Sequence, residues 1–69
     1  MDKKVYLQEI GMQFKLERIR QRLTQNQLAE KSKLNPRTIS VIEQGVESSR
    51  VHILKRVAEA LEKPLSQFV

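Results

Sequence analysis

The 69-residue chain has no cysteine and only one histidine, and these absences exclude several kinds of site. Without cysteine no disulfide can stabilise the fold, and without a cluster of Cys and His no zinc site can form. His52 has no acid–base companion. No glycine-rich phosphate loop or paired acidic motif is present, so nothing assembles a nucleophile, a base and an oxyanion site. We therefore expect no metal, no cofactor and no enzymatic activity.

Long apolar runs are also missing, which argues against a membrane span or a signal peptide. The lack of cysteine is compatible with the reducing cytoplasm, where we expect the protein to act. A chain of this length forms one small domain whose core supplies only ~3 to 5 kcal/mol, so close helix packing or dimerisation must stabilise it. The 13 Lys and Arg against 8 Asp and Glu leave a net charge of +5, which favours a polyanionic partner.

Two short helices joined by a tight turn are predicted between Thr24 and Gly45. The Thr24 hydroxyl can accept from a first-turn N–H while Gln27 reaches back, which is a capping box. Asn35 is a good N-cap for the second helix, with Pro36 at its first position, where a missing N–H costs nothing. Gly45 supplies the stop after that helix.

The apolar side chains of this stretch converge on one core only if the chain turns sharply near residues 32–34. They are Leu28, Ala29, Leu34, Ile39 and Ile42. The outer face of the second helix carries short or hydrogen-bonding side chains and one guanidinium: Asn35, Pro36, Arg37, Thr38, Ser40, Val41 and Gln44. Such a face suits a DNA major groove about 12 Å wide, where Arg pairs bidentately with guanine and short side chains touch thymine methyls or phosphates.

At these residues the chain resembles the helix-turn-helix family of phage Cro and lambda-type repressors, also called the XRE family. The matching residues are Thr24-Gln25, Leu28-Ala29, Leu34, Ile39-Ser40, Ile42-Glu43 and Gly45. Further matches lie in the family's first, fourth and fifth helices, at Ile10-Gly11, Phe14-Lys15, Arg18, Leu54, Val57-Ala58, Ala60-Leu61 and Pro64-Leu65. The resemblance implies an all-α, five-helix lambda-repressor-like DNA-binding domain over residues 10–69, after an N-terminal extension over residues 1–9.

The resemblance also implies roles for single residues. In the family, an arginine at the place of Arg18 pairs with a glutamate at the place of Glu43 as a structural ion pair; the alternative is that Arg18 touches phosphate. Gln25 matches a glutamine that reaches a phosphate in relatives. Two positions depart from the family's glycines. Lys33 lies in the turn, where a non-glycine residue at φ > 0 costs of order 1 kcal/mol, and Arg22 precedes the first cap.

The first helix is expected from about Leu7 to Leu23, with Ile10 and Phe14 on its core face. Residues 1–9 form a disordered tail, a basic arm or a helical extension, of which we favour the extension. A second apolar stripe lies on nearly the opposite face, at Met12, Leu16 and Ile19. These side chains are either single exposed apolar residues, which are normal on surfaces, or a contact for another subunit or protein.

The segment after Gly45 is expected to place a loop near the DNA backbone, with Ser48 or Ser49 capping the next helix and Arg50 beside a phosphate site. An amphipathic helix then runs from about Arg50 to Glu62. Its core side is Ile53, Leu54, Val57, Ala58 and Leu61, and its solvated side is Lys55, Arg56, Glu59 and Glu62. A final short helix begins at Pro64. Leu65, Phe68 and Val69 either close the monomer core or form the two-fold dimer contact common in the family.

The leading hypothesis is a sequence-specific, double-stranded DNA-binding transcriptional regulator, most simply a repressor acting as a homodimer on a palindromic operator. Base contacts are assigned to Arg37 first, then to Asn35, Ser40 and Val41, with apolar contact from Pro36. Phosphate contacts are assigned to Gln25, Thr38, Gln44, Ser49 and Arg50. The alternative is an antitoxin or partner-binding module that autoregulates through the same domain, using Met12, Leu16 and Ile19. Binding of nucleic acid without sequence preference is a third interpretation.

Overall fold

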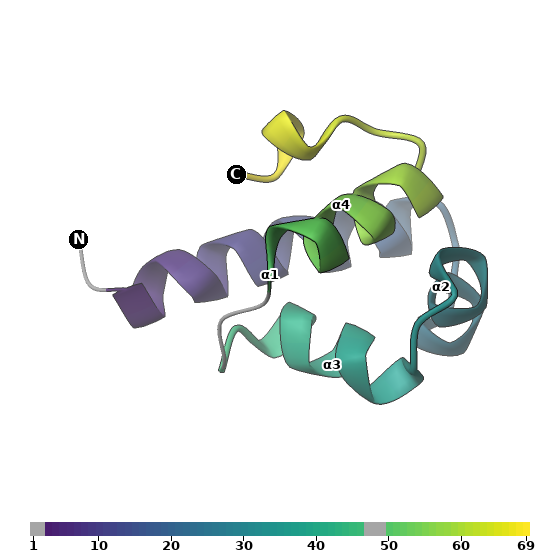
Figure 1. Cartoon of the computed structure of the whole chain (residues 1–69), viewed down its shortest axis with the longest axis horizontal. Coiled ribbons are helices and arrows are strands. Elements are labelled where there is room, and N and C mark those ends of the chain that lie inside the picture. Colours follow the sequence, from purple (N-terminus) through teal and green to yellow (C-terminus); the bar gives the residue numbers. More distant parts are fainter. Residues whose placement is uncertain (1–2, 47–49) are drawn as a thin grey trace.

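The computed structural model describes residues 3–46 and 50–69, with side chains from residue 7 onward, and this part of the chain is helical without strands. Its elements are α1 (Lys3–Arg20), α2 (Gln25–Ser32), α3 (Pro36–Gln44), α4 (Val51–Ala60) and a 3₁₀ helix, η1 (Leu65–Gln67). Helix α1 lies along the long axis of the molecule, and α2 stands near one end of it (Figure 1). Helix α3 packs against α1 and α2, while α4 packs against α2 and η1.

The fifth α-helix expected at the C-terminus is a single 3₁₀ turn, so that expectation was wrong and the described residues form four α-helices. Its hydrogen bonds span three residues, from the Gln67 N–H to the Pro64 carbonyl at 3.0 Å and from the Phe68 N–H to the Leu65 carbonyl at 2.9 Å. Three-residue spacing is usual in short pieces, because one turn is too short to gain the cooperativity of an α-helix.

The core is built around Phe14 of α1, which is fully buried with Leu28, Ile39, Val57 and Leu61. Phe68, just after η1, stacks on Phe14 with ring centroids 4.3 Å apart and an interplanar angle of 12°. Phe68 is 4% exposed, so the C-terminal turn closes the core of the single chain. Aromatic stacking adds to the stabilisation that burial of the two rings already supplies.

Helix boundaries follow local caps where the sequence supplies them. Thr24 Oγ1 accepts from the Gln27 N–H at 3.0 Å and Gln27 Oε1 accepts from the Thr24 N–H at 2.8 Å, which confirms the capping box. The N-cap at Asn35 and the C-cap at Gly45 confirm the predicted bounds of α3. Helix α1 begins at Lys3, so residues 3–9 form the helical extension that we favoured. Two predicted helix ends were wrong, because α1 ends at Arg20 rather than Leu23 and α4 ends at Ala60 rather than Glu62; Arg50 is the N-cap of α4 without a side-chain bond. The serines expected to cap α4, Ser48 and Ser49, lie outside the described residues.

Among the described residues, three with side chains adopt the left-handed conformation that glycine adopts most easily. Arg22 and Glu62 lie just beyond α1 and α4 with φ of 60° and 59°, and Lys33 caps α2 with φ of 59°. The expectation of positive φ at Lys33 is thus confirmed. Each such residue costs about 1 to 2 kcal/mol relative to the right-handed conformation, so the rest of the fold must hold these turns in place.

Both glycines lie where α1 and α3 cross. A Cβ atom on Gly11 would lie 2.2 Å from the carbonyl oxygen of Ile42, which is backbone and cannot move aside as a side chain can. Gly45, the left-handed C-cap of α3 with φ of 64°, lies so close to α1 that a Cβ would be 2.5 Å from Gln8 Cα. The two helices therefore meet backbone to backbone, and this fixes where α3 lies.

Candidate DNA-binding surface

The start of α3 is organised by its own first residues. Asn35 has an extended backbone with φ of −75° and ψ of 140°, and its Oδ1 accepts from the Arg37 N–H at 2.8 Å. Pro36 follows as the first helical residue, as the sequence predicts. All three residues are exposed. The leading edge of this helix is therefore capped locally and stands in solvent.

Helix α3 has one buried face and one outer face. The buried face consists of Ile39, Ile42 and Glu43. On the outer face Gln44 is exposed like the three residues of the leading edge, and Thr38, Ser40 and Val41 are partly exposed. The seven residues predicted to stay outside therefore lie together on one accessible surface. The Gln44 side-chain amide donates to Ser40 Oγ at 2.7 Å, so Ser40 accepts there and keeps its hydroxyl proton for donation.

The position of α3 is fixed by a polar cluster that joins three helices. Arg18 of α1 donates to both carboxylate oxygens of Glu43, through Nε at 2.6 Å and Nη2 at 3.1 Å. Its Nη1 also donates to the Leu23 carbonyl at 2.8 Å. Gln25, the first residue of α2, donates to Glu43 Oε1 at 3.0 Å. A bidentate pair of this kind gives geometric precision as well as attraction, and here it orients the whole helix.

Burial determines how much this cluster contributes. The Arg18 and Glu43 side chains are 11% and 3% exposed. Within the described residues, every buried side-chain nitrogen and oxygen has a hydrogen-bond partner. Removing one partner of such a pair leaves a buried charge uncompensated, whereas the intact pair holds its geometry. The same cluster orients Gln25 at the first turn of α2, through its bond to Glu43 of α3.

A family model described as helix-turn-helix matches residues 14–68. The chain belongs to this helix-turn-helix family. The family is of the XRE type and acts in DNA-binding transcriptional regulation. Helices α2 and α3 and the turn between them lie within the matched residues.

Among solved structures, the fold is similar to the crystal structure of the clp gene regulator ClgR from C. glutamicum. The TM-score is 0.84 and the sequences are 24% identical, over 91% of this chain and 82% of that chain. At this identity the likeness establishes the helix-turn-helix fold. No curated protein gives a significant match to the sequence.

The remaining residues proposed from sequence for phosphate or dimer contacts do not belong to α3 or lie outside the described residues. Arg50 is exposed at the N-cap of α4, and Ser49 lies outside the described residues. At the C-terminus Leu65 is half-buried and Val69 exposed, whereas Phe68 is in the core. Of the three residues suggested for a dimer contact, two are thus accessible on the single chain.

The second apolar stripe of α1 is exposed. Met12, Leu16 and Ile19 are 47%, 52% and 51% exposed, while Ile10 and Phe14 on the same helix are buried. The helix thus has apolar residues on two faces, and only one of them is covered in the single chain.

A polar network between α1 and the C-terminal turn was not predicted from sequence. Gln21 Nε2 donates to the buried Glu17 carboxylate at 3.0 Å and to the Leu61 carbonyl at 2.8 Å, and Gln67 donates to Glu17 at 3.3 Å. The hydrogen bond from Gln21 lowers the pKa of Glu17 from its ordinary value of 4.5. Burial acts in the opposite direction, and the cations Arg20 and Lys63 lower it further. The only sequence signal was an acidic residue on the core face of an amphipathic helix.

No structural feature of the described residues suggests metal binding or membrane insertion. Within residues 3–46 and 50–69, no three His, Cys, Asp or Glu side chains come close enough together to hold a metal ion. None of the helices there combines the length and the apolar character that crossing a bilayer requires.

Proposed function

We propose that this helix-turn-helix protein is a sequence-specific, double-stranded DNA-binding regulator, most simply a repressor that acts as a homodimer. The observation that carries the proposal is the exposed, capped leading edge of α3, held outward by the buried Arg18–Glu43 pair. A net charge of +5 adds attraction to a polyanion. Helix α3 is the recognition helix, which lies in the major groove with its first turn nearest the bases.

Base contacts come from the start and the outer face of α3. Arg37 is the principal residue, because a guanidinium donates bidentately to O6 and N7 of guanine. Asn35, Ser40 and Val41 make the secondary contacts, and Pro36 offers only apolar contact with a thymine methyl. All five are exposed or partly exposed on one surface.

Phosphate contacts set affinity and register without sequence preference. They are assigned to Gln25, Thr38, Gln44, Ser49 and Arg50. Gln25 and Thr38 are partly exposed, while Gln44 and Arg50 are exposed, so these four are available at the surface. The bond from Gln25 to Glu43 aligns its amide beside α3 before DNA arrives.

The base-contacting role is tested with Arg37→Ala and Arg50→Ala, which each remove one exposed cation. Duplexes selected from a random library are compared with scrambled duplexes. Arg37→Ala is expected to lose ~1 to 3 kcal/mol on the selected sequence and to relax preference at one base pair, whereas Arg50→Ala weakens both duplexes alike. Equal losses on both duplexes for Arg37→Ala would contradict the assignment.

A homodimer implies a palindromic operator whose half-site centres lie about 34 to 36 Å apart, one helical turn. Leu65 and Val69 are the accessible candidates for the dimer contact. The mass of the protein in solution and on DNA, measured together with the symmetry of the selected sequences, tests this part. Tight binding of a monomer to an isolated half-site would contradict it.

The exposed stripe at Met12, Leu16 and Ile19 supports a second candidate function, an antitoxin or partner-binding module that autoregulates through the same domain. Lys15 and Arg20 on the same helix are exposed, so an acidic amphipathic helix is the partner chemistry that fits. Co-purification of a toxin with the wild-type protein but not with Leu16→Lys would support it. Unchanged mass and DNA binding of Leu16→Lys, with no co-purifying partner, would leave the stripe without such a role.

A further inference from the structure

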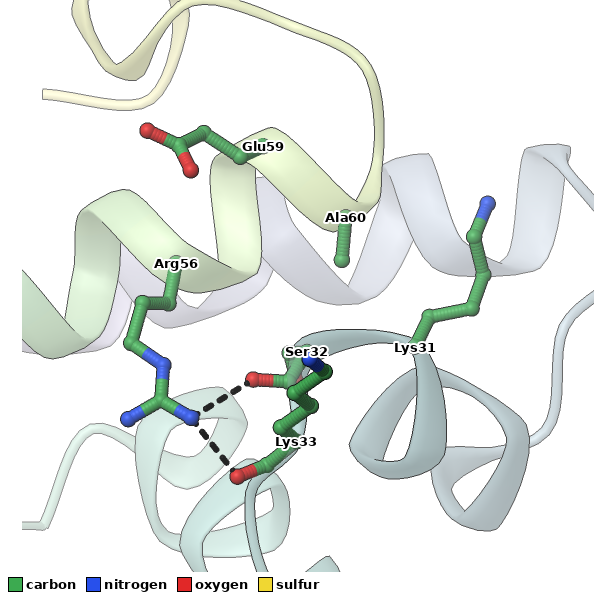
Figure 2. A pocket seen from close by; sticks show the side chains of 6 residues that line it. All are labelled: Lys31, Ser32, Lys33, Arg56, Glu59 and Ala60. Atoms are coloured by element: carbon green, nitrogen blue, oxygen red, sulfur yellow. Dashed lines mark hydrogen bonds between the residues drawn. The ribbon is translucent and has the colours of Figure 1, made fainter.

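A shallow hollow of about 280 Å³ lies where α4 passes the end of α2. It is lined by Lys31, Ser32, Lys33, Arg56, Glu59 and Ala60 (Figure 2). Arg56 Nη2 donates to the Ser32 carbonyl at 3.1 Å and to the Lys33 carbonyl at 2.7 Å. Figure 2 shows the Lys31 amino group and the Glu59 carboxylate pointing away from these bonds. The charged groups therefore do not converge on a ligand, and the polar contact that characterises the hollow is between α4 and the turn after α2.

Arg56 was expected on the solvated side of its helix. It is exposed, yet its guanidinium supplies donors where α2 needs them. The last carbonyls of a helix have no partner within the helix, and its C-terminus attracts cations. Here the Lys33 N–H bonds to the Glu30 carbonyl at 3.2 Å and the Leu34 N–H to the Ala29 carbonyl at 2.8 Å. Arg56 binds the Ser32 and Lys33 carbonyls, at the point where the chain leaves α2.

The residue held in this way has the unfavourable left-handed conformation. Lys33 has φ of 59° and ψ of 40°, and only Leu34 separates it from Asn35, the N-cap of the recognition helix. Because the dihedrals of Lys33 set the direction in which the chain leaves α2, they also set where α3 begins. The exposed first turn of α3 is the part of that helix nearest to this turn in the chain, so a change at Lys33 acts on it directly.

We propose that Arg56 is a positioning residue for DNA recognition: its two hydrogen bonds keep the Lys33 turn in the conformation that aims the start of α3 into the major groove. This inference rests on the proposed function. It assigns to α4, which is outside the two helices of the motif, control over the specificity of binding. A direct phosphate contact by Arg56 is the competing role, and the two roles differ in what they do to sequence preference and salt dependence.

The experiment measures binding of wild type, Arg56→Ala, Arg56→Lys and Lys55→Ala to a selected duplex and a scrambled duplex over a series of salt concentrations. Lys55 is the matched control, since it is the exposed cation next to Arg56 in α4. Arg56→Ala is expected to lose about tenfold in affinity for the selected duplex, the range expected for loss of a charged hydrogen bond. On the scrambled duplex it loses no more than Lys55→Ala, so the specificity ratio falls. Arg56→Lys keeps the charge and loses less of the ratio than Arg56→Ala.

A second arm uses the turn itself. Lys33→Gly removes the left-handed strain, so the turn no longer depends on Arg56 to the same degree. Arg56→Ala in the Lys33→Gly background is therefore expected to lower the specificity ratio by only about threefold or less, as strongly coupled neighbours are not additive. In the free protein, amide exchange at Lys33 and Leu34, whose N–H groups bond to the Glu30 and Ala29 carbonyls, is expected to speed up in Arg56→Ala and to stay unchanged in Lys55→Ala.

The outcomes that overturn the inference are distinct from failure of the proposed function. Equal losses on both duplexes, with the salt slope reduced by about one, would assign Arg56 to a phosphate. A specificity ratio of Arg56→Ala equal to that of Lys55→Ala would also overturn the inference. If wild type does not distinguish the two duplexes, the proposed function fails and the role in specificity fails with it, even where the amide exchange shows that Arg56 holds the turn. If Arg56→Ala does not fold, Arg56→Lys carries the test with a smaller expected fall in the specificity ratio, and a ratio equal to that of Lys55→Ala would again overturn the inference.

Discussion

The crossing of α1 and α3 and the three turns at helix ends use opposite means to hold the backbone. At the crossing, Gly11 and Gly45 remove side chains so that two helices can touch. At the turns, Arg22, Lys33 and Glu62 take a conformation that suits glycine, yet keep their side chains. The two glycines are thus placed where space is limiting, and the strained dihedrals are placed where it is not.

Side chains from elsewhere hold these turns. Arg56 donates to the Ser32 and Lys33 carbonyls, Arg18 donates to the carbonyl of Leu23, the residue after Arg22, and Gln21 donates to the carbonyl of Leu61, the residue before Glu62. Each strained residue therefore lies at or next to a carbonyl that a side chain binds. At two of the turns that side chain is more than twenty positions away in sequence, whereas Arg18 is five positions from Leu23. Strain at a turn can thus be offset by side-chain hydrogen bonds, whereas a steric limit at a crossing cannot.

The largest loss of stability is expected from removing the ion pair that holds α1 and α3 at their crossing. Glu43→Ala leaves Arg18 buried without its partner, which is expected to cost roughly 3 to 5 kcal/mol, comparable to the whole stability that a core of this size supplies. Urea unfolding followed by circular dichroism measures it. The control is Glu59→Ala, which removes an exposed carboxylate of α4. Similar midpoints for the two variants would show that the pair does not hold the crossing.

The next effect tests the space at the crossing. Gly11→Ala is expected to destabilise by about 2 to 3 kcal/mol, because the new Cβ meets the Ile42 carbonyl. Helix propensity alone predicts the opposite, a gain of about 0.5 to 1 kcal/mol. The sign of the change in the urea midpoint therefore decides between the two. A higher midpoint in the variant would mean that α1 and α3 can move apart without loss.

A smaller effect of opposite sign is expected at a turn. Arg22→Gly removes left-handed strain at the expense of a more flexible unfolded chain, for a net gain of about 0.5 to 1 kcal/mol. That gain raises the melting temperature by about 2 to 8 °C in a domain of this size. Arg22→Ala is the control, since it removes the charge and keeps a Cβ. Equal melting temperatures for the two variants would mean that the change in stability comes from loss of the charge and not from the backbone conformation.

The smallest effect concerns the network beside two of the turns. Because the folded protein lowers the pKa of Glu17, its carboxylate contributes stability above the ordinary value of 4.5, and this contribution is lost as pH falls through the folded value. Glu17→Gln is expected to flatten the acid side of the melting temperature profile below pH 4.5. Glu9→Gln, an exposed control on the same helix, keeps the wild-type profile. Parallel profiles for both variants and wild type would contradict the role of the network.

Features that depend on neighbouring residues were predictable from sequence. The cap at Thr24, Pro36 as the first residue of α3 and the stop at Gly45 each follow from two or three adjacent positions. The positive φ at Lys33 was instead predicted from the family resemblance, because relatives carry glycine in this turn. The buried face of α3 follows from periodicity, since one helical repeat decides which side chains point inward. The outer face of α3, with its exposed start, is the complement of that pattern.

Features that depend on which helices meet were not predictable in the same way. Nothing near Arg56 in sequence indicates that its side chain bonds to a turn more than twenty positions earlier. Glu17 looks in sequence like any other charged helix residue, and its role is evident only because the fold places Gln67 beside it. The N-cap of α4 was not predicted either, because Arg50 takes that position without the side-chain hydrogen bond on which cap prediction relies. The steric role of Gly11 likewise appears only when α3 is packed on α1.

The stacking of Phe68 on Phe14 has a consequence for biosynthesis. These two residues come from nearly opposite ends of the described chain and share the centre of one core. While a ribosome is still adding the intervening residues, Phe14 has no ring to pack against, and the interior stays open to water. Nascent chains that have not passed residue 68 are therefore exposed to chaperones and proteases, whereas the finished domain is not.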